Sequence, residues 1–472
     1  MELSIHAVRL RRADLETRMP FKYGIATMTA LPHLFCEVDL TWQGTRQTGV
    51  SADHLAPKWF TKDPKRDPED EVAEMIHVHR HAASVATGLK GSDVFTVWQD
   101  LHRQQEAWGD AQGYPPLLTH FGTALVERAI IDAVCRATHR PFQELLRANA
   151  LGIDLGNLHA ELAGASPADL LPREPVPAIQ ARHTVGLVDP LTQADGVDRP
   201  EAPQDGLPHT LEEVIHHYGV THFKLKVGED VDASLERLKG ICRVVEQSVG
   251  PEARFTIDGN ESWHTVDAFR TFWRAMLDEP DLALLKKGLL FLEQPFHRDI
   301  ALGDDMQETL TAWEDRPPVI IDESDGDLDC LPRALDCGYV GTSHKNCKGV
   351  IHGVAGRCLL THRQQASGRE HLMSGEDLSN IGPVALPQDL AVQAALGNSS
   401  VERNGHHYFA GLSFWPQSIQ KLMTTHHEDL YRPTDAGWPA LAIRDGRLPL
   451  TSVNHAPFGL AALPDLAFLP EV

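Results

Sequence analysis

Lysines and carboxylates recur at regular intervals in the second half of the chain. Each ends a short apolar run, and together they are Lys224, Lys226, Asp258, Glu293, Asp322 and Lys345. The gaps from Lys226 onward are 32, 35, 29 and 23 residues, each about one strand-and-helix unit. In a closed parallel barrel the carboxyl ends of the strands meet at one mouth, where barrel enzymes have their active sites. The spacing therefore predicts that these side chains surround a single pocket.

Three carboxylates without histidine or cysteine partners are hard oxygen ligands, which suit Mg²⁺, with Mn²⁺ as the alternative. Lysines beside such a site indicate abstraction of a proton from a carbon next to a carboxylate, because a metal and an ammonium stabilise the charge of the resulting enediolate. A neutral lysine can remove that proton if its pKa falls from about 10.4 toward neutrality. Burial, the metal and Lys224 would all lower the pKa of Lys226. Lys345, from the other side of the barrel, could serve the opposite face of the same carbon.

Strand alternation predicts which side chains face inward. Lys224 and Lys226 share one face of their strand, and the apolar residues that alternate with them share the other. We expect the lysines to face the barrel axis and the apolar residues to face the helices. At the fifth strand, alternation allows either Asp322 or Glu323 to point inward.

The chemistry-bearing residues belong to a series of strands that alternate with helical segments. Seven strands are predicted at 178–188, 222–226, 254–258, 289–293, 319–322, 340–345 and 371–374, with a weaker eighth at 401–403. A strand-and-helix period of about thirty residues is typical of βαβ units in a parallel sheet. We therefore predict an α/β fold with a (β/α)8-type barrel over residues 151–439. The Pro-, Gly- and Asp-rich stretch 189–208 is expected to be a mobile excursion from it.

The first 150 residues differ in texture and predict a separate α+β domain. Its expected elements are a hairpin of strands 3–10 and 34–40 with Gly24 in the loop, a helical region at 67–101, a helix at 116–139 and a short helix ending near 146. Strands followed by segregated helices favour a domain that packs beside the barrel.

Composition excludes several classes of protein. Apolar residues make up 42% of the 472 positions and charged residues 23%, which are ordinary globular values. A net charge of −23 argues against nucleic acid or an anionic membrane as a partner. No apolar stretch approaches the length that crosses a bilayer, and the opening residues lack the features of a secretory signal. Seven scattered cysteines favour reduced thiols and a cytoplasmic location.

Five short motifs in order resemble those of the enolase superfamily, most of all the muconate-lactonizing-like branch of its mandelate racemase/muconate lactonizing enzyme group. They are Lys224-Leu225-Lys226, Asp258-Gly259-Asn260, Glu293-Gln294-Pro295, Asp322-Glu323-Ser324 and Lys345-Asn346-Cys347-Lys348-Gly349. Each motif alone is weak, but five at barrel spacing are a strong signal. The resemblance covers most of the chain: residues 1–150 look like the family's capping domain, and 440–472 look like the closing segment that completes it.

The resemblance implies a role for each residue. Asp258, Glu293 and Asp322 would bind Mg²⁺, and Asp322 is favoured over Glu323 at the third position. Two lysines, Lys226 and Lys345, would be the acid/base pair. Of the remaining two site residues, Lys224 would hold the carboxylate of the substrate, and Asn260 would support the metal or the substrate.

Departures from the family pattern disfavour some of the reactions that the family catalyses. No Asp-x-Asp pair occurs near the eighth strand, which disfavours a dipeptide epimerase, and no histidine base is evident at the seventh strand. Glu376 and Asp377 at that strand would either line the pocket or cap a helix. Lys348 stands where glycine is common and is expected to be solvated, as are His406 and His407.

These features predict a Mg²⁺-dependent enzyme that abstracts the proton α to a carboxylate of a small carboxylic acid, giving an enolate. A racemase or epimerase, a cycloisomerase and a related lyase are all compatible with two lysines on opposite faces. The alternatives are an acid-sugar dehydratase of the same superfamily and a non-catalytic barrel that retains the fold. The sequence leaves open whether the chain forms a homo-oligomer.

Overall fold

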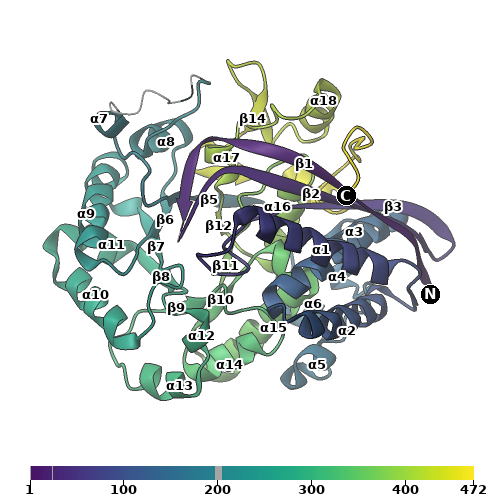
Figure 1. Cartoon of the computed structure of the whole chain (residues 1–472), viewed down its shortest axis with the longest axis horizontal. Helices are drawn as coiled ribbons and strands as arrows, with labels where there is room; N and C mark the ends of the chain where they lie inside the picture. The colour runs from purple at the N-terminus through teal and green to yellow at the C-terminus, as the bar shows by residue number, and fades with distance from the viewer. Residues whose placement is uncertain (1, 24, 197–202, 204) are drawn as a thin grey trace.

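The computed structural model describes the whole chain except residues 1, 24, 197–202 and 204. Gly24, expected in the hairpin loop, and part of the 189–208 stretch thus lie outside the described residues. Two main sheets organise the rest of the chain: an antiparallel sheet ordered β3-β2-β1-β4 and a closed barrel of eight parallel strands. Figure 1 shows the long strands of the first sheet arching across one end of the barrel, with the N-terminal helices beside them.

The N-terminal region is an α+β unit, as predicted, but its elements are longer and more numerous. Its strands are β1 (Leu3–Tyr23), β2 (Ala26–Trp42), β3 (Thr45–His54) and β4 (Lys90–Gly91). Its helices are α1 (Pro68–Ala86), α2 (Val94–Gln112), α3 (Pro116–Thr138) and α4 (Phe142–Arg147). The prediction of one helical region at 67–101 was therefore wrong in detail, because β4 separates two helices there.

Strand β3 escaped prediction because it is buried on both faces, and the face that packs against α3 is polar. Ser51 Oγ donates to the Leu125 carbonyl at 2.5 Å, and Asp53 accepts from Arg128 at 2.7 Å. A Cβ on Gly49 would collide with the backbone of Ala129, so glycine lets α3 approach this strand closely. Polar groups that are paired in this way can be buried without an apolar alternation in the sequence.

The barrel contains all eight predicted strands. They are β5 (Ala178–Val185), β6 (His222–Lys226), β7 (Arg254–Asp258), β8 (Leu289–Glu293), β9 (Val319–Ile321), β10 (Gly341–His344), β11 (Leu372–Gly375) and β12 (Ser400–Glu402). Neighbouring strands pair in parallel, and β12 pairs with β5, which closes the barrel. The weak eighth strand is thus confirmed.

Helices surround the strands. They include α8 (Leu211–Tyr218), α9 (Val231–Ser248), α10 (Val266–Asp278), α11 (Ala283–Gly288), α13 (Asp304–Thr311), α14 (Cys330–Cys337), α15 (Val350–Ser367) and α16 (Ala385–Leu396). Local sequence fixes their starts: Thr210 and Glu213 form a capping box at α8, and Asp230 accepts from the backbone of Ala233 at α9. Short helices α12 (Arg298–Ala301) and α17 (Gly405–Tyr408) follow β8 and β12.

The hairpin of β1 and β2 is fastened to the barrel beside β12. The Arg18 guanidinium donates to the His407 carbonyl at 2.6 Å, and the rings of Phe21 and Tyr408 stack at 4.1 Å. Both His406 and His407 are buried, so the expectation that they lie on the surface was wrong. They are enclosed because α17 packs beneath the hairpin.

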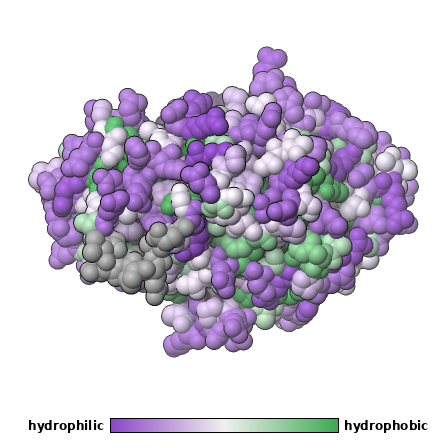
Figure 2. Space-filling model, turned by 90° about the horizontal axis from the view of Figure 1, so that it is seen from above, coloured by the Kyte–Doolittle hydropathy of each residue, from purple (hydrophilic) through white to green (hydrophobic). Residues whose placement is uncertain are grey.

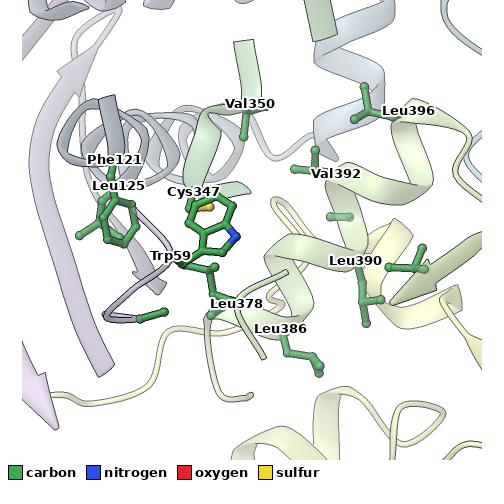
Figure 3. Packing of buried hydrophobic residues seen from close by; sticks show 14 of the residues in the cluster. Trp59, Phe121, Leu125, Cys347, Val350, Leu378, Leu386, Leu390, Val392 and Leu396 are labelled. Carbon is green, nitrogen blue, oxygen red and sulfur yellow. The ribbon is translucent and has the colours of Figure 1, made fainter. Parts of the chain in front are cut away.

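A shared hydrophobic core joins the N-terminal helices to the barrel. Figure 3 shows Trp59 between α3, represented by Phe121 and Leu125, and the barrel residues Cys347 and Leu378. All five side chains are buried. Trp59, on the loop between β3 and α1, is therefore held at the junction of the two parts of the molecule.

The C-terminal residues return to the N-terminal region. Arg11 pairs with Glu471 at 2.9 Å, and Arg136 donates to the Leu460 carbonyl at 2.7 Å. These contacts join the two ends of the chain. That 440–472 completes the cap, and where the domains divide, stay predictions.

Polar residues cover most of the face seen in Figure 2, with smaller hydrophobic areas between them. The seven cysteines are all free thiols. Among the described residues, no helix combines the length and apolar character needed to cross a bilayer.

Candidate active site

Lys224 lies at the centre of the barrel mouth. Its ammonium donates to Glu293 Oε1 at 2.8 Å, Glu376 Oε2 at 2.9 Å and Glu402 Oε2 at 2.7 Å, and it lies 3.0 Å from Asp258 Oδ2. These carboxylates come from different strands or strand ends, so Lys224 faces the barrel axis, as alternation predicted. Burial alone would lower the pKa of Lys224, but the four carboxylates outweigh it and raise that pKa well above its ordinary value.

Lys226 and Asp258 form a second contact at the mouth. The Lys226 ammonium donates to Asp258 Oδ2 at 2.5 Å, and the Asn260 backbone N–H donates to Asp258 Oδ1 at 2.7 Å. Burial opposes ionisation of Asp258, yet Lys224 and Lys226 hold the pKa of Asp258 below its usual value. The Asp258 carboxylate is therefore charged and is held between the two lysines of β6 and the backbone of Asn260.

Lys345, the residue after β10, lies across the barrel mouth from Lys226 and Asp258. Its ammonium donates to Asp322 Oδ2 at 2.6 Å and to Glu376 Oε2 at 2.8 Å, and it lies 5.2 Å from the centre of the Trp59 ring. Burial would lower the pKa of Lys345, but Asp322 and Glu376 raise it well above the ordinary value. These two carboxylates therefore favour the ammonium form of Lys345.

Lys348 is buried, so the expectation that it is solvated was wrong. Its ammonium donates to the backbone carbonyl of Asp322 at 2.7 Å and lies 3.0 Å from Asp322 Oδ1. The hydroxyl of Ser343 donates to the same carboxylate oxygen. Asp322 is thereby held from several sides, and although burial opposes its ionisation, Lys345 and Lys348 keep the pKa of Asp322 low.

Three carboxylates approach one another closely enough to share a metal ion. One oxygen from each of Glu293, Asp322 and Glu376 lies within 4.8 Å of the others, and all three residues are buried. Burial and then the charges of Asp258, Glu376 and Asp322 raise the pKa of Glu293 well above its usual value, and Glu293 Oε2 has no hydrogen-bond partner. An under-compensated oxygen cluster of this kind fits a divalent cation.

This cluster differs in one member from the predicted ligand set. Glu376 is a member of the cluster, although it was not among the predicted ligands. Asp258, a predicted ligand, is not a member and is linked to the cluster through its contact with Lys224. Glu323 does not point into it: its Oε1 accepts from the Asn260 side chain at 3.4 Å, and burial raises the pKa of Glu323 to about 7. Of the two residues that alternation left open, Asp322 is thus the one that faces the lysines.

Glu376 and Glu402 are the site residues that sequence reasoning left unassigned. Glu376 bridges Lys224 and Lys345 and also pairs with Arg182 at 3.2 Å. Glu402 is fixed by Thr184, whose hydroxyl donates to it at 2.5 Å. Their positions at the ends of β11 and β12 repeat the strand-end signal that identified the other groups.

A cavity opens above these groups and contains about 490 Å³ of empty space, part of which is open to solvent. Its polar lining includes Lys224, Lys226, Asp258, Asn260, Asp322, Lys345, Asp377, Ser379, Glu402 and Asn404. Its apolar lining is Phe21, Met28, Leu31, Ala56, Trp59 and Leu378. All of the apolar residues except Leu378 come from the N-terminal region, which therefore forms the roof of the site.

Comparisons with known proteins agree with this architecture. Residues 207–438 match the family described as Enolase C-terminal domain-like. The muconate lactonizing enzyme from Pseudomonas fluorescens, solved with muconolactone, is 17% identical with a TM-score of 0.61 over 98% of each chain. No curated protein sequence matches the chain.

Two further solved structures contain magnesium. An enolase from Bradyrhizobium, complexed with magnesium and mandelic acid, is 16% identical with a TM-score of 0.55 over 96% of this chain and 98% of that one. A dipeptide epimerase from Enterococcus faecalis, complexed with Mg and a dipeptide, is 14% identical with a TM-score of 0.57 over 94% and 99%. At these identities the similarity shows the shared fold. The family match covers residues 207–438, which contain barrel strands β6 to β12, and over nearly its whole length the chain shares the fold of these solved structures.

Proposed function

We propose that this enzyme removes the proton α to the carboxylate of a small carboxylic acid, in a Mg²⁺-dependent reaction that gives an enolate. The observation that carries the proposal is the placement of Lys226 and Lys345. Lys226 ends β6 and Lys345 follows β10, and these strands are four apart in a closed ring of eight. Both lysines line the same cavity. Two amines that face each other in this way can act on opposite faces of one carbon.

The charges around the lysines support proton transfer by a lysine. Lys224, Lys226 and Lys345 each contact a carboxylate of the proposed metal site. A bound divalent cation adds positive charge beside these ammonium groups. That added charge favours loss of a proton from an ammonium and stabilises the anion formed when the substrate loses its own.

The residues that would hold the cation are Asp258, Glu293 and Asp322, with Glu376 beside them. When bound, Mg²⁺ would supply Lewis-acid stabilisation of the substrate's carboxylate oxygens as negative charge develops there. Lys224 is placed to hold the same carboxylate through its ammonium. Asn260, whose backbone fixes Asp258, would orient that ligand and the substrate.

The roof of the cavity favours a partly apolar substrate. Phe21, Met28, Leu31 and Trp59 would contact the part of the acid that points away from the lysines. An acid sugar, the alternative considered from the sequence, carries hydroxyl groups along its length, and those that reach the apolar roof would be buried against hydrocarbon without partners. A non-catalytic barrel would not need to retain every lysine and carboxylate of the motif set.

Exchange of the α-hydrogen with solvent deuterium tests the proposal. We expect Mg²⁺-loaded protein to exchange both enantiomers of a suitable 2-substituted acid, followed by proton NMR over a panel of α-hydroxy, N-acylamino and aromatic acids. Lys226→Ala should abolish exchange of one enantiomer, and Lys345→Ala should abolish exchange of the other. Each lysine variant should also retain exchange of the enantiomer served by its partner.

Lys65→Ala is the matched control, because Lys65 is exposed and is not among the residues that line the cavity. It should exchange both enantiomers at the rate of the original protein. Unchanged exchange of both enantiomers in both active-site variants would rule out the assigned roles of the two lysines.

A further inference from the structure

Asn404 is a buried amide beside the proposed catalytic groups. It follows β12, is only 4% exposed, and lines the cavity together with Lys226 and Lys345. Its Nδ2 donates to Glu402 Oε1 at 2.8 Å, whereas its Oδ1 has no hydrogen-bond partner. The sequence motifs assigned no role to this residue.

The chemistry of Glu402 fixes the orientation of the Asn404 amide. An ionised carboxylate can only accept hydrogen bonds, so the amide must present its NH₂ group to Glu402 and keep its carbonyl oxygen away. Glu402 is held in turn by Lys224 and Thr184, at 2.7 and 2.5 Å. The contacts of Glu402 therefore hold the Asn404 amide in the orientation that leaves Oδ1 without a hydrogen-bond partner.

A buried acceptor without a partner costs free energy, and such atoms are uncommon in folded proteins. The group that satisfies Asn404 Oδ1 must donate a hydrogen bond. It is not the substrate's carboxylate, which cannot donate and which the negative charge of Glu402 would repel. A hydroxyl or N–H group of the bound acid meets both requirements.

We propose that Asn404 binds a hydroxyl or N–H group of the substrate, so that the enzyme selects small carboxylic acids that combine this donor with an apolar group. The inference rests on the proposed function, because the same cavity must hold the acid. The carboxylate group of the acid lies beside the lysines and the side chains that would hold the metal. The roof residues Phe21 and Trp59 contact its apolar group, and Asn404 reads the donor.

Matched pairs of acids test the donor requirement. One pair is mandelate and its O-methyl ether, and the other is N-acetylphenylglycine and its N-methyl derivative. In each second member a methyl group replaces the donated hydrogen. With the Mg²⁺-loaded protein, calorimetry should show that the donor member of at least one pair binds about tenfold more tightly. The pair that shows the preference distinguishes a hydroxyl from an N–H group.

The variant Asn404→Leu removes the acceptor at similar volume. We expect the ratio of the two Kd values of the preferred pair to fall toward one in this variant, because only the contact with Asn404 differs between the two proteins. Asn404→Gln, which keeps the amide, should recover part of the preference. Asn398→Leu is the control: Asn398 is also buried and also donates to a side chain, Gln393 at 2.6 Å, but it does not line the cavity.

Equal affinity for both members of each pair in the original protein would overturn the inference, as would a preference that survives in Asn404→Leu. If those proteins still exchange the α-hydrogen of the acids with solvent deuterium, the proposed function stands while the role of Asn404 falls. Donor-dependent binding without any α-exchange would support the role of Asn404 and exclude the proposed function. If none of the four acids binds, the inferred substrate class is wrong.

Discussion

A single oxygen, Glu376 Oε2, accepts hydrogen bonds from both Lys224 at 2.9 Å and Lys345 at 2.8 Å. Burial opposes ionisation of Glu376, but the two lysines and Arg182 hold its pKa well below the usual value. This carboxylate joins the first lysine motif to the lysine on the far side of the barrel. It therefore sets the distance between two of the positive charges on which the site depends.

Replacing that bridge should destabilise the fold. Glu376→Gln leaves buried ammonium groups with less negative charge around them, and breaking a buried ion pair from one side typically costs about 3 kcal/mol or more. We expect a fall of that size in the free energy of unfolding, measured with urea at pH 7. Glu370→Gln, at an exposed position, should change the same quantity by less than about 0.5 kcal/mol. A Glu376→Gln protein as stable as the original would show that the bridge contributes little.

Asp258→Asn should weaken metal binding. The amide keeps the shape of the side chain but loses the negative charge that a divalent cation requires, and it leaves Lys226 without its carboxylate partner. Isothermal titration with Mg²⁺, and with Mn²⁺ for comparison, should show at least a tenfold loss of affinity. Mutation of a residue that only hydrogen-bonds to a metal ligand already causes a loss of about this size. Asp267→Asn, on the exposed face of α10, should bind as the original does. Equal affinity in both variants would exclude Asp258 as a ligand.

Glu127 predicts a dependence of stability on pH. Burial raises the pKa of this α3 carboxyl from 4.5 to about 7, although the Ile351 N–H that donates to it at 2.6 Å partly opposes the shift. Because the folded protein binds the proton more tightly, this contribution to stability is complete below pH 4.5 and disappears as the pH rises through 7.

Glu127→Gln should remove that dependence, since glutamine has no proton to lose and can still accept from Ile351. The variant should gain up to about 3 kcal/mol relative to the original protein at pH 8, and much less at pH 5. Urea unfolding at the two pH values measures the difference. Glu246→Gln, at an exposed position on α9, should show no such gain. An equal effect of Glu127→Gln at both pH values would contradict the shifted pKa.

Arg298 connects the barrel to the roof of the cavity. Its guanidinium donates to the carbonyls of Trp59 at 2.9 Å and Phe60 at 2.8 Å, and it also pairs with buried Glu261 at 2.7 Å. Arg298→Lys keeps the charge but cannot make these contacts together. We expect a lower Tm and a higher KM for the exchanged acid with a smaller change in kcat, because Trp59 loses its support. Arg274→Lys, which is exposed, is the control, and an unaltered KM in Arg298→Lys would refute the connection.

The strands of the barrel could be predicted because their signal is local. Each has a short apolar run and a polar end, and alternation alone placed Lys224 and Lys226 on the inner face. The lengths of β1 and β2 and the existence of β3 could not be predicted, because these strands are stabilised by contacts distant in sequence. The pairing of Asp53 with Arg128 is one of them.

The sequence by itself determined which lysines and carboxylates could reach the barrel mouth, since the period of the βα units brings all strand ends to one side. Tertiary structure decided which of them touch. It buried Lys348 against Asp322, brought Glu376 between two lysines, and left Asn404 Oδ1 without a partner. These outcomes depend on side-chain directions and on burial in a closed barrel under the N-terminal roof, where differences of an ångström in separation decide the strength of each interaction.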